Sequence, residues 1–217
     1  ADAILSGAEP IYVPLHPPHF NFDEEVLAAA FAQRPKAIVV CNPSNPSGKV
    51  FTRDELMIIL KYAQQYDTWV IMDEPYEHII YAPHTHTYFN TLPGAFERTI
   101  TCNSLSKTYS ITGWRLGYVH APASVIAQAK KVHDFLTVGA AAPLMEAAVG
   151  ALELPDSYYA GLTALYRAKR EIFLDILRST GLPFTEPQGA YYVMVDITAL
   201  GFANDTLASE WLIKDIG

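Results

Sequence analysis

The chain has 217 residues and half of them are hydrophobic, which is enough to bury the core of one large domain or of one domain and part of a second. Its 23 acidic and 15 basic residues give a net charge of −8, which argues against a nucleic-acid surface of clustered Lys and Arg. No apolar run reaches the length of a membrane span and no signal peptide opens the chain, so a soluble cytoplasmic protein is expected.

Strand-like and helix-like segments alternate along the first part of the chain. The predicted strands are residues 9–15, 36–41, 68–72, 98–102 and 115–120. Helices are predicted over residues 23–33 and from a capping box of Thr52 and Glu55 to about residue 66. The run 36–41 is continuously apolar, as expected of a strand buried on both faces. Strands spaced by helices pair in parallel, so we expect an α/β fold with a mostly parallel sheet sandwiched by helices.

From about residue 121 the pattern becomes helical. One long helix is predicted over residues 156–180, because Pro155 precedes it and Gly181 follows it. Its apolar side chains form two neighbouring stripes, namely Leu165, Ala168, Ile172 and Ile176, and Leu162, Tyr166, Phe173 and Leu177. A strand over 189–195 and a short helix over 205–214 follow, and a domain boundary is expected near residue 155.

Three polar segments come directly after predicted strands. They are residues 42–45, 73–76 and 104–107. Ligands of open parallel sheets bind outside the carboxyl ends of the strands, so these segments are expected to meet along one rim. The two cysteines, Cys41 and Cys102, lie in the strands themselves and are expected to be small buried hydrophobes in a reducing compartment.

The residue types on this rim suit a phosphorylated aldehyde that carries a pyridine ring. The Lys107 amine can form a Schiff base with the aldehyde. The Asp73 carboxylate can keep the pyridine nitrogen protonated, which makes the ring an electron sink. The phenol of Tyr76 and the amide of Asn45 can hydrogen-bond a ring oxygen.

A phosphate group has its own candidate partners in the same region. Ser104 and Ser106 supply hydroxyls, and Arg115 supplies a fork of N–H donors. Together with Lys107 and Asp73 these residues predict pyridoxal phosphate chemistry.

In order, spacing and identity these residues resemble the class I/II pyridoxal-phosphate aminotransferases, which have the aspartate-aminotransferase-like fold type I. The resemblance rests on residues 42–48, 73–76, 104–107, 113–118 and 189–192, and so covers nearly the whole chain. It implies that the cofactor is pyridoxal 5′-phosphate. The residues implied to bind it are Asn45, Asp73, Tyr76, Ser104, Ser106, Lys107 and Arg115.

The resemblance also assigns roles to some of these residues. Lys107, Asp73 and Tyr76 are implied to be catalytic, with Lys107 acting as the imine lysine and later moving a proton. Asn45 is implied to touch the substrate carboxylate as well as the cofactor. No metal site is expected from His78 and the two histidines at 84 and 86, because no Cys and no further ligand of suitable spacing accompany them.

The resemblance further implies two domains, both incomplete. Residues 1–154 would be the cofactor-binding large domain, and residues 155–217 an interdomain helix and the start of a small α+β C-terminal domain. The upstream phosphate loop, the N-terminal arm and the C-terminal arginine of the family are absent from the sequence, so a fragment is expected. Tyr191 and Tyr192 are expected near the site, one of them facing away because neighbouring strand residues point to opposite faces.

The expected function is transfer of an amino group between an amino acid and a 2-oxo acid, by a homodimer when full length, with no nucleic-acid or membrane partner. Residues 112–118 most resemble the subgroup of the family that acts on neutral, aromatic or sulfur-containing amino acids. A C–S or β-lyase, or an aminocyclopropane-carboxylate-synthase-like enzyme, has similar site motifs and remains an alternative. A further alternative is the effector domain of a transcription regulator that binds the same cofactor.

Overall fold

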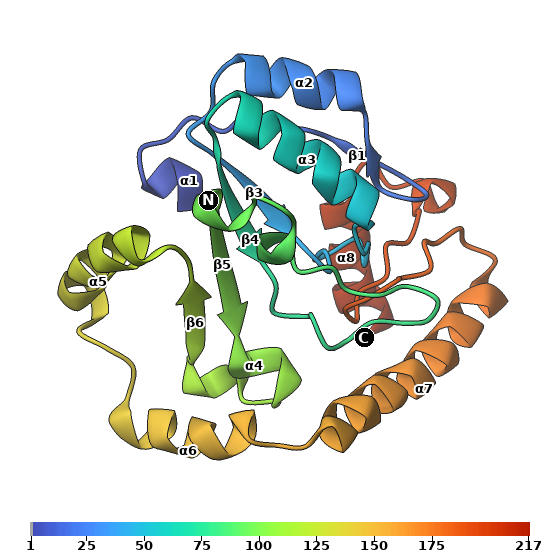
Figure 1. The fold of residues 1–217 in the computed structure, drawn as a ribbon. Helices are drawn as coiled ribbons and strands as arrows, with labels where there is room; N and C mark the ends of the chain where they lie inside the picture. Colours follow the sequence, from blue (N-terminus) through green and yellow to red (C-terminus); the bar gives the residue numbers. More distant parts are fainter. Residues whose placement is uncertain (1) are drawn as a thin grey trace.

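A four-stranded sheet forms the centre of the computed structural model, which describes residues 2–217 (Figure 1). Its strands lie in the order β3 (Ala37–Cys41), β4 (Trp69–Asp73), β5 (Thr99–Ser104) and β6 (Gly117–His120). β3, β4 and β5 are parallel, as predicted, whereas β6 runs antiparallel to β5. The connection between β5 and β6 holds only α4 (Leu105–Thr108) and a 3-10 turn (Thr112–Trp114) instead of a crossover helix, so the chain reverses.

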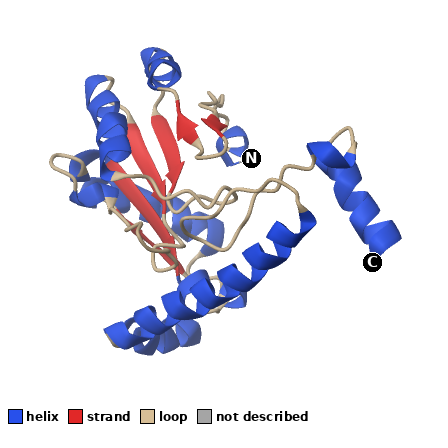
Figure 2. Cartoon of the chain, turned by 90° about the vertical axis from the view of Figure 1, so that its right-hand side faces the viewer, coloured by secondary structure: helices blue, strands red, loops and turns tan. Residues whose placement is uncertain are grey.

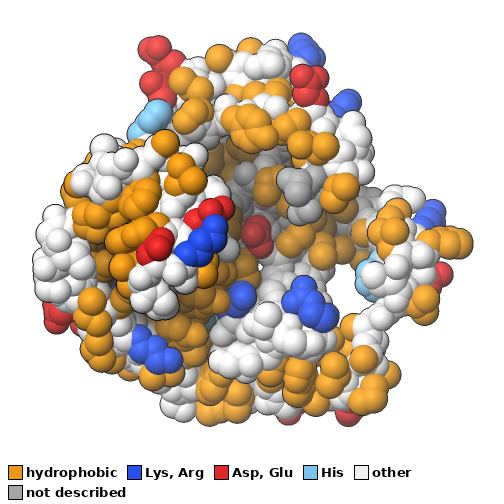
Figure 3. Space-filling model, turned by 180° about the vertical axis from the view of Figure 1, so that it is seen from behind, with side chains coloured by type: hydrophobic (Ala, Val, Ile, Leu, Met, Phe, Trp, Pro, Cys, Tyr) orange, Lys and Arg blue, Asp and Glu red, His pale blue; other side chains and the backbone are white. Residues whose placement is uncertain are grey.

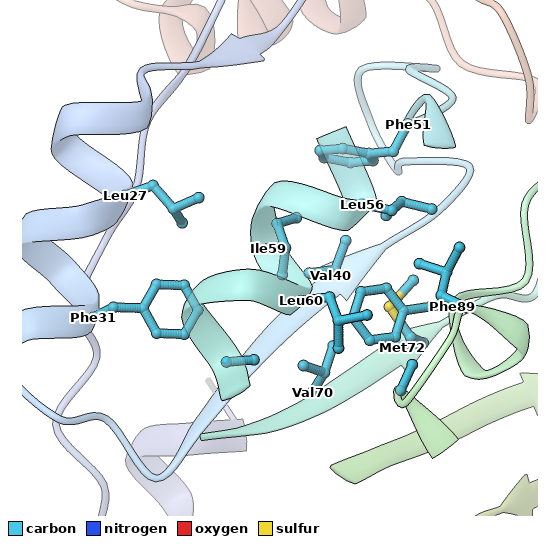
Figure 4. Packing of buried hydrophobic residues seen from close by; sticks show 13 residues of the cluster. Leu27, Phe31, Val40, Phe51, Leu56, Ile59, Leu60, Val70, Met72 and Phe89 are labelled. Atoms are coloured by element: carbon cyan, nitrogen blue, oxygen red, sulfur yellow. The ribbon is translucent and has the colours of Figure 1, made fainter. Parts of the chain in front are cut away.

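Two helices cover one face of this sheet (Figures 1 and 4). α2 (Glu24–Ala32) begins at Asp23, whose Oδ1 accepts a hydrogen bond from Glu25 N at 2.7 Å. α3 (Arg53–Gln65) begins with the predicted capping box. Their buried side chains interlock with those of β3, β4 and the segment after β4; the cluster is Leu27, Phe31, Val40, Phe51, Leu56, Ile59, Leu60, Ala63, Val70, Met72, Phe89, Leu92 and Ala95. Each large member stabilises the fold by about 1.5–3 kcal/mol.

The other face of β3 is open in the described part of the chain. Val39 is 65% exposed, so the expectation that this strand would be buried on both faces is wrong. The continuous apolar run made both faces look equally suited to burial, but only the side that carries Val40 meets α2 and α3. The predicted helical region follows β6 as α5 (Ala123–Thr137) and α6 (Ala142–Leu152).

The long helix α7 (Asp156–Thr180) has the predicted bounds and ends at Gly181 with φ 72°. Only one side of it packs against the rest of the molecule: Leu162 is buried against Tyr76 and its neighbours, and Leu174 is also buried. Ile172, on the other predicted stripe, is 65% exposed. A long helix at the edge of the molecule meets its neighbours along a single line of contact, as Figures 1 and 2 show.

Two predicted strands are largely absent. In place of 9–15 there is only a two-residue pairing of β1 (Leu15–His16) with β2 (Asn21–Phe22), preceded by α1 (Asp2–Leu5). Residues 189–195 form no ladder, only isolated bridges from Gly189 to Ile80 and from Val195 to Phe184. Ala190 has φ 58°, a left-handed conformation that interrupts an extended run.

The last helix is confirmed in part, as α8 (Asp205–Trp211) continued by a π-helical turn (Leu212–Ile216). It stands apart from the sheet at the end of extended loops (Figure 2). Short 3-10 turns occur at Phe89–Thr91, Phe96–Arg98 and Thr198–Leu200. Within residues 2–217, no helix combines the length and the hydropathy needed to cross a bilayer.

Candidate active site

The carboxyl ends of the three parallel strands bring the predicted segments to one rim. Asp73 lies opposite Cys41 on β3 and opposite Cys102 on β5. Asn42 N donates to Asp73 O at 2.9 Å, and Glu74 N donates to Cys102 O at 3.0 Å, so the pairing continues past the strand ends. Seen from behind, the molecule is hollowed near the centre of the face, with acidic and basic side chains at the hollow and hydrophobic ones around it (Figure 3).

Asp73 presents an exposed carboxylate at the end of β4. Apart from its approach to the Cys41 thiol, it forms no hydrogen bond or ion pair with the side chains of residues 3–217. Burial, together with the nearby Asp73 charge, raises the pKa of Cys41 to about 12, so this thiol stays protonated. Burial and Asp73 also raise the pKa of Cys102. Both cysteines are free and half-buried, and the carboxylate is therefore flanked by neutral groups.

Asn45 lies in a tight loop after β3. Ser44 N donates to Lys49 O at 2.8 Å and Gly48 N donates to Ser44 O at 2.9 Å, which closes the loop. The Cys41 Sγ accepts from Asn45 N at 3.4 Å. The Asn45 side chain is exposed and has no hydrogen-bond partner in the described part of the chain, so its amide is available to a ligand.

The segment around Gly189 docks on this loop. Gln188 N and Gly189 N both donate to Gly48 O at 2.9 Å. The approach is close enough that a Cβ at Gly48 would lie 2.5 Å from Pro187 Cβ. Ala190 N donates to Ile79 O at 2.8 Å, which ties the same segment to the turn after β4. These contacts carry Tyr191 and Tyr192 to the site.

Tyr76 is buried among these tyrosines. Its hydroxyl lies 2.6 Å from that of Tyr192, and the rings of Tyr191 and Tyr192 stand nearly perpendicular to it at 5.3 and 5.7 Å. Both therefore contact Tyr76, and the expectation that one faces away is wrong, because Ala190 breaks the strand alternation. Burial and the hydrogen bond to Tyr192 raise the pKa of Tyr76, which keeps its phenol protonated.

Lys107 lies in α4, directly after β5, and is half-buried. Its ammonium forms no hydrogen bond or ion pair with the side chains of residues 3–217. It is near Tyr166: burial raises the pKa of that phenol, and the Lys107 charge opposes the rise. A residue of α7 holds α4 in place: Tyr158 Oη donates a hydrogen bond to Thr108 O at 2.8 Å. The backbone that carries Lys107 is thus fixed, while the side-chain nitrogen remains available to a ligand.

The predicted phosphate ligands lie on the same short helix and the turn after it. Ser104 Oγ accepts from Ser106 N at 3.1 Å and so caps α4. Ser106 O accepts from Ile111 N at 3.1 Å, which folds the following turn back on the helix. Arg115 has φ 55°, and its Nη1 donates to Thr112 O at 3.0 Å. The reversal between β5 and β6 therefore places the serines and the arginine on one connecting segment.

Glu77 was missed by the sequence reasoning, although it lies directly after Tyr76. It accepts from Asn103 Nδ2 at 2.7 Å, and Tyr118 Oη lies 3.5 Å away. Burial, followed by the charge of Glu77, raises the pKa of Tyr118 to about 12. The only signal in the sequence was its place in the turn. Among the described side chains, residues 3–217, no three His, Cys, Asp or Glu are grouped to hold a metal ion.

Comparison with known proteins identifies the family. The profile of the aminotransferase class I and II family matches residues 1–216. The chain belongs to this family. Kynurenine–oxoglutarate transaminase 3 of Mus musculus is 36% identical over 214 residues, which cover 91% of this chain and 47% of that protein. The methionine aminotransferase of Escherichia coli (strain K12) is 32% identical over 213 residues, covering 98% and 55%.

Solved structures of the family agree with this fold. The structure of N-succinyldiaminopimelate aminotransferase from Mycobacterium tuberculosis has a TM-score of 0.93 at 31% identity, over 98% of this chain and 56% of that one. The fold-type-I large-domain architecture predicted from the motifs is thereby confirmed. The chain spans about half the length of the relatives that it matches.

Members of this family depend on pyridoxal 5′-phosphate, and the donor set of this aminotransferase chain fits that cofactor. The rim offers a free amine, an exposed carboxylate with neutral neighbours, and a phenol whose raised pKa keeps its proton. Hydroxyls and a guanidinium lie on the adjoining turn. These are the groups that an aldehyde, a pyridine nitrogen, a ring hydroxyl and a phosphate require.

Proposed function

We propose that the protein containing this chain is a pyridoxal-phosphate-dependent transaminase, which moves an amino group between an amino acid and a 2-oxo acid. The proposal rests above all on one observation: the free amine of Lys107 and the exposed carboxylate of Asp73 follow neighbouring parallel strands on one rim. Membership of the aminotransferase family supports the reaction type.

When bound, pyridoxal phosphate supplies an aldehyde and a ring that accepts electrons from the substrate's Cα. Lys107 would hold the aldehyde carbon through Nζ, and its free amine would move the proton at the substrate's Cα. Asp73 keeps the pyridine nitrogen protonated. The Tyr76 phenol, whose raised pKa keeps it protonated, would bind the ring oxygen. These roles follow from the chemistry of the side chains and from their order on the rim.

The remaining residues bind and orient. Ser104 and Ser106 offer hydroxyls, and Arg115 offers paired N–H donors, to the phosphate. Asn45 offers an amide to the ring oxygen and to the substrate carboxylate; its exposed and unpartnered side chain supports this. Tyr192 Oη, 2.6 Å from the Tyr76 hydroxyl, helps to fix the position of that hydroxyl.

For the substrate we propose a neutral, aromatic or sulfur-containing amino acid. Tyrosines gather beside Lys107: Tyr109 Oη lies 2.8 Å from Tyr159 Oη, and the ring of Tyr109 stacks on that of Tyr158. Such rings suit an uncharged side chain better than a carboxylate. Relatives named for kynurenine and methionine are compatible with this class, although others are named for aspartate.

We further propose that the full-length protein is a cytoplasmic homodimer in which residues 1–154 form the cofactor-binding domain and residues 155–217 begin the smaller one. Two free cysteines beside the site are in keeping with a reducing compartment. Apolar side chains remain exposed on α5, where Phe135 is 92% exposed, which supports burial against a further surface.

The test uses the full-length holoenzyme and its Lys107→Ala variant. The wild type is expected to absorb visible light and to trap the cofactor with borohydride, and the variant to lose both. Methionine and phenylalanine should convert the cofactor to its aminated form about tenfold faster than aspartate does. Retention of absorbance and trapping by the variant would exclude Lys107. Pyruvate and ammonia from a β-substituted donor, without aminated cofactor, would identify a lyase instead.

A further inference from the structure

A buried acidic residue and a buried histidine meet beside Asp73. Glu74 is 1% exposed, and the side chain of His86 is 6% exposed. Glu74 Oε1 and His86 Nε2 lie 3.3 Å apart, outside strict hydrogen-bond geometry, and neither atom has another partner among the side chains of residues 3–217. A buried carboxylate is costly unless it is paired, so each of these atoms depends on the other.

Asn42 determines which nitrogen of the imidazole carries the proton. Its Oδ1 accepts from Phe51 N at 3.0 Å, so its NH₂ group is the end that faces His86 Nδ1 at 3.5 Å. Nδ1 must then accept a hydrogen bond, and the ring proton resides on Nε2. The Nε2–H is therefore on the side of the ring whose nitrogen lies 3.3 Å from Glu74 Oε1. The ring of Tyr88 stands perpendicular to the imidazole at 4.6 Å and keeps it in this place.

The imidazole therefore joins the ends of two strands. Asn42 directly follows β3 and begins the loop that carries Asn45, whereas Glu74 directly follows Asp73 at the end of β4. The backbone hydrogen bond from Asn42 N to Asp73 O, 2.9 Å long, links the same two segments. His86 itself comes from the loop after β4, so it supports this junction from outside both strands.

We propose that His86 is a positioning residue: as the Nε2–H tautomer it bridges Asn42 and Glu74 and so holds Asn45 and the Asp73 carboxylate at the separation that the cofactor ring needs. The proposal rests on the transaminase function proposed above. His86 acts through these neighbours and does not touch the reacting atoms.

Two substitutions at His86 in the full-length protein separate the bridge from simple packing. His86→Phe keeps a flat ring but removes both polar atoms, whereas His86→Gln keeps one acceptor and one donor. His84→Phe is the matched control, because His84 lies in the same loop and its side chain has no hydrogen bond in the described part of the chain. The measurements are the dissociation constant of pyridoxal phosphate from the apoenzyme and the pH midpoint of the visible absorbance of the holoenzyme.

His86→Phe is expected to weaken cofactor binding about tenfold and to shift the pH midpoint, because it leaves two buried polar groups unpaired. His86→Gln should recover wild-type binding to within about threefold, and His84→Phe should match the wild type. Equal behaviour of His86→Phe and the wild type, or of His86→Phe and His86→Gln, would overturn the positioning role.

If His86→Phe fails to fold, the ¹⁵N chemical shifts of His86 in the wild type decide the matter. An unprotonated Nδ1 and a protonated Nε2 near neutral pH are expected, and the opposite tautomer or a doubly protonated ring would overturn the proposal. Lys107→Ala is measured alongside. If that variant keeps the visible absorbance, the proposed function fails; if it loses the absorbance while His86→Phe binds normally, only the positioning role fails.

Discussion

Replacing Gly48 by alanine would test whether the loop after β3 and the segment at Pro187 form a single unit. Gly48 has φ 70°, a conformation that costs an alanine about 1–2 kcal/mol. The added Cβ would also lie 2.5 Å from Pro187 Cβ and 3.0 Å from Pro187 Cα, and such overpacking costs about 1–3 kcal/mol more. Together these costs predict a loss of about 2–5 kcal/mol in the free energy of unfolding.

Urea unfolding of the full-length protein measures this loss, with two other glycines as controls. Gly181 also has positive φ, 72°, but a Cβ there would meet nothing within 4 Å, so Gly181→Ala should show the backbone cost alone. Gly161 lies within α7 in open space, and Gly161→Ala should raise stability by about 0.5–1 kcal/mol. A Gly48→Ala protein no less stable than Gly181→Ala would refute the close packing of the two segments.

Three further substitutions address the site and its support. Asp73→Asn should retain covalently bound cofactor yet lose about 3 kcal/mol of transition-state stabilisation, and near-normal turnover would contradict its electrostatic role. Tyr192→Phe should lower the pKa of Tyr76, because it removes the hydrogen bond to Tyr192 that raises this pKa, and it should cost about 1 kcal/mol of stability. An unchanged titration of the phenol, followed by ultraviolet absorbance, would argue against this hydrogen bond. Glu55→Gln should lower the stability measured by thermal unfolding by about 3 kcal/mol, because the Lys49 ammonium loses its carboxylate partner at 2.7 Å and the Lys49 side chain is only 4% exposed. A melting temperature equal to that of the wild type would mean that the hydrogen bond to Asn21 is enough to stabilise the buried ammonium.

The helices were predicted well because their signals are local. Thr52 and Glu55 satisfy each other's backbone within one turn, and Pro155 and Gly181 bracket α7 by their own conformational preferences. The composition of the rim could also be predicted from the sequence, since polar residues placed directly after apolar runs must emerge at the ends of parallel strands. No comparable local signal shows which side of α7 stays exposed to solvent.

From its order of residues alone this chain determined the bounds of α2, α3 and α7, its three parallel strands and the set of groups on one rim, because each depends on neighbours a few positions apart. Only the tertiary structure decided that Tyr192 meets Tyr76, 116 positions away, and that His86 lies between Asn42 and Glu74. Those contacts depend on how loops fold over one another, and the left-handed backbone at Ala190 and the reversal into β6 arise from the same packing. Periodicity reports which side of an element is apolar, but it carries no information on which distant segment will cover that side.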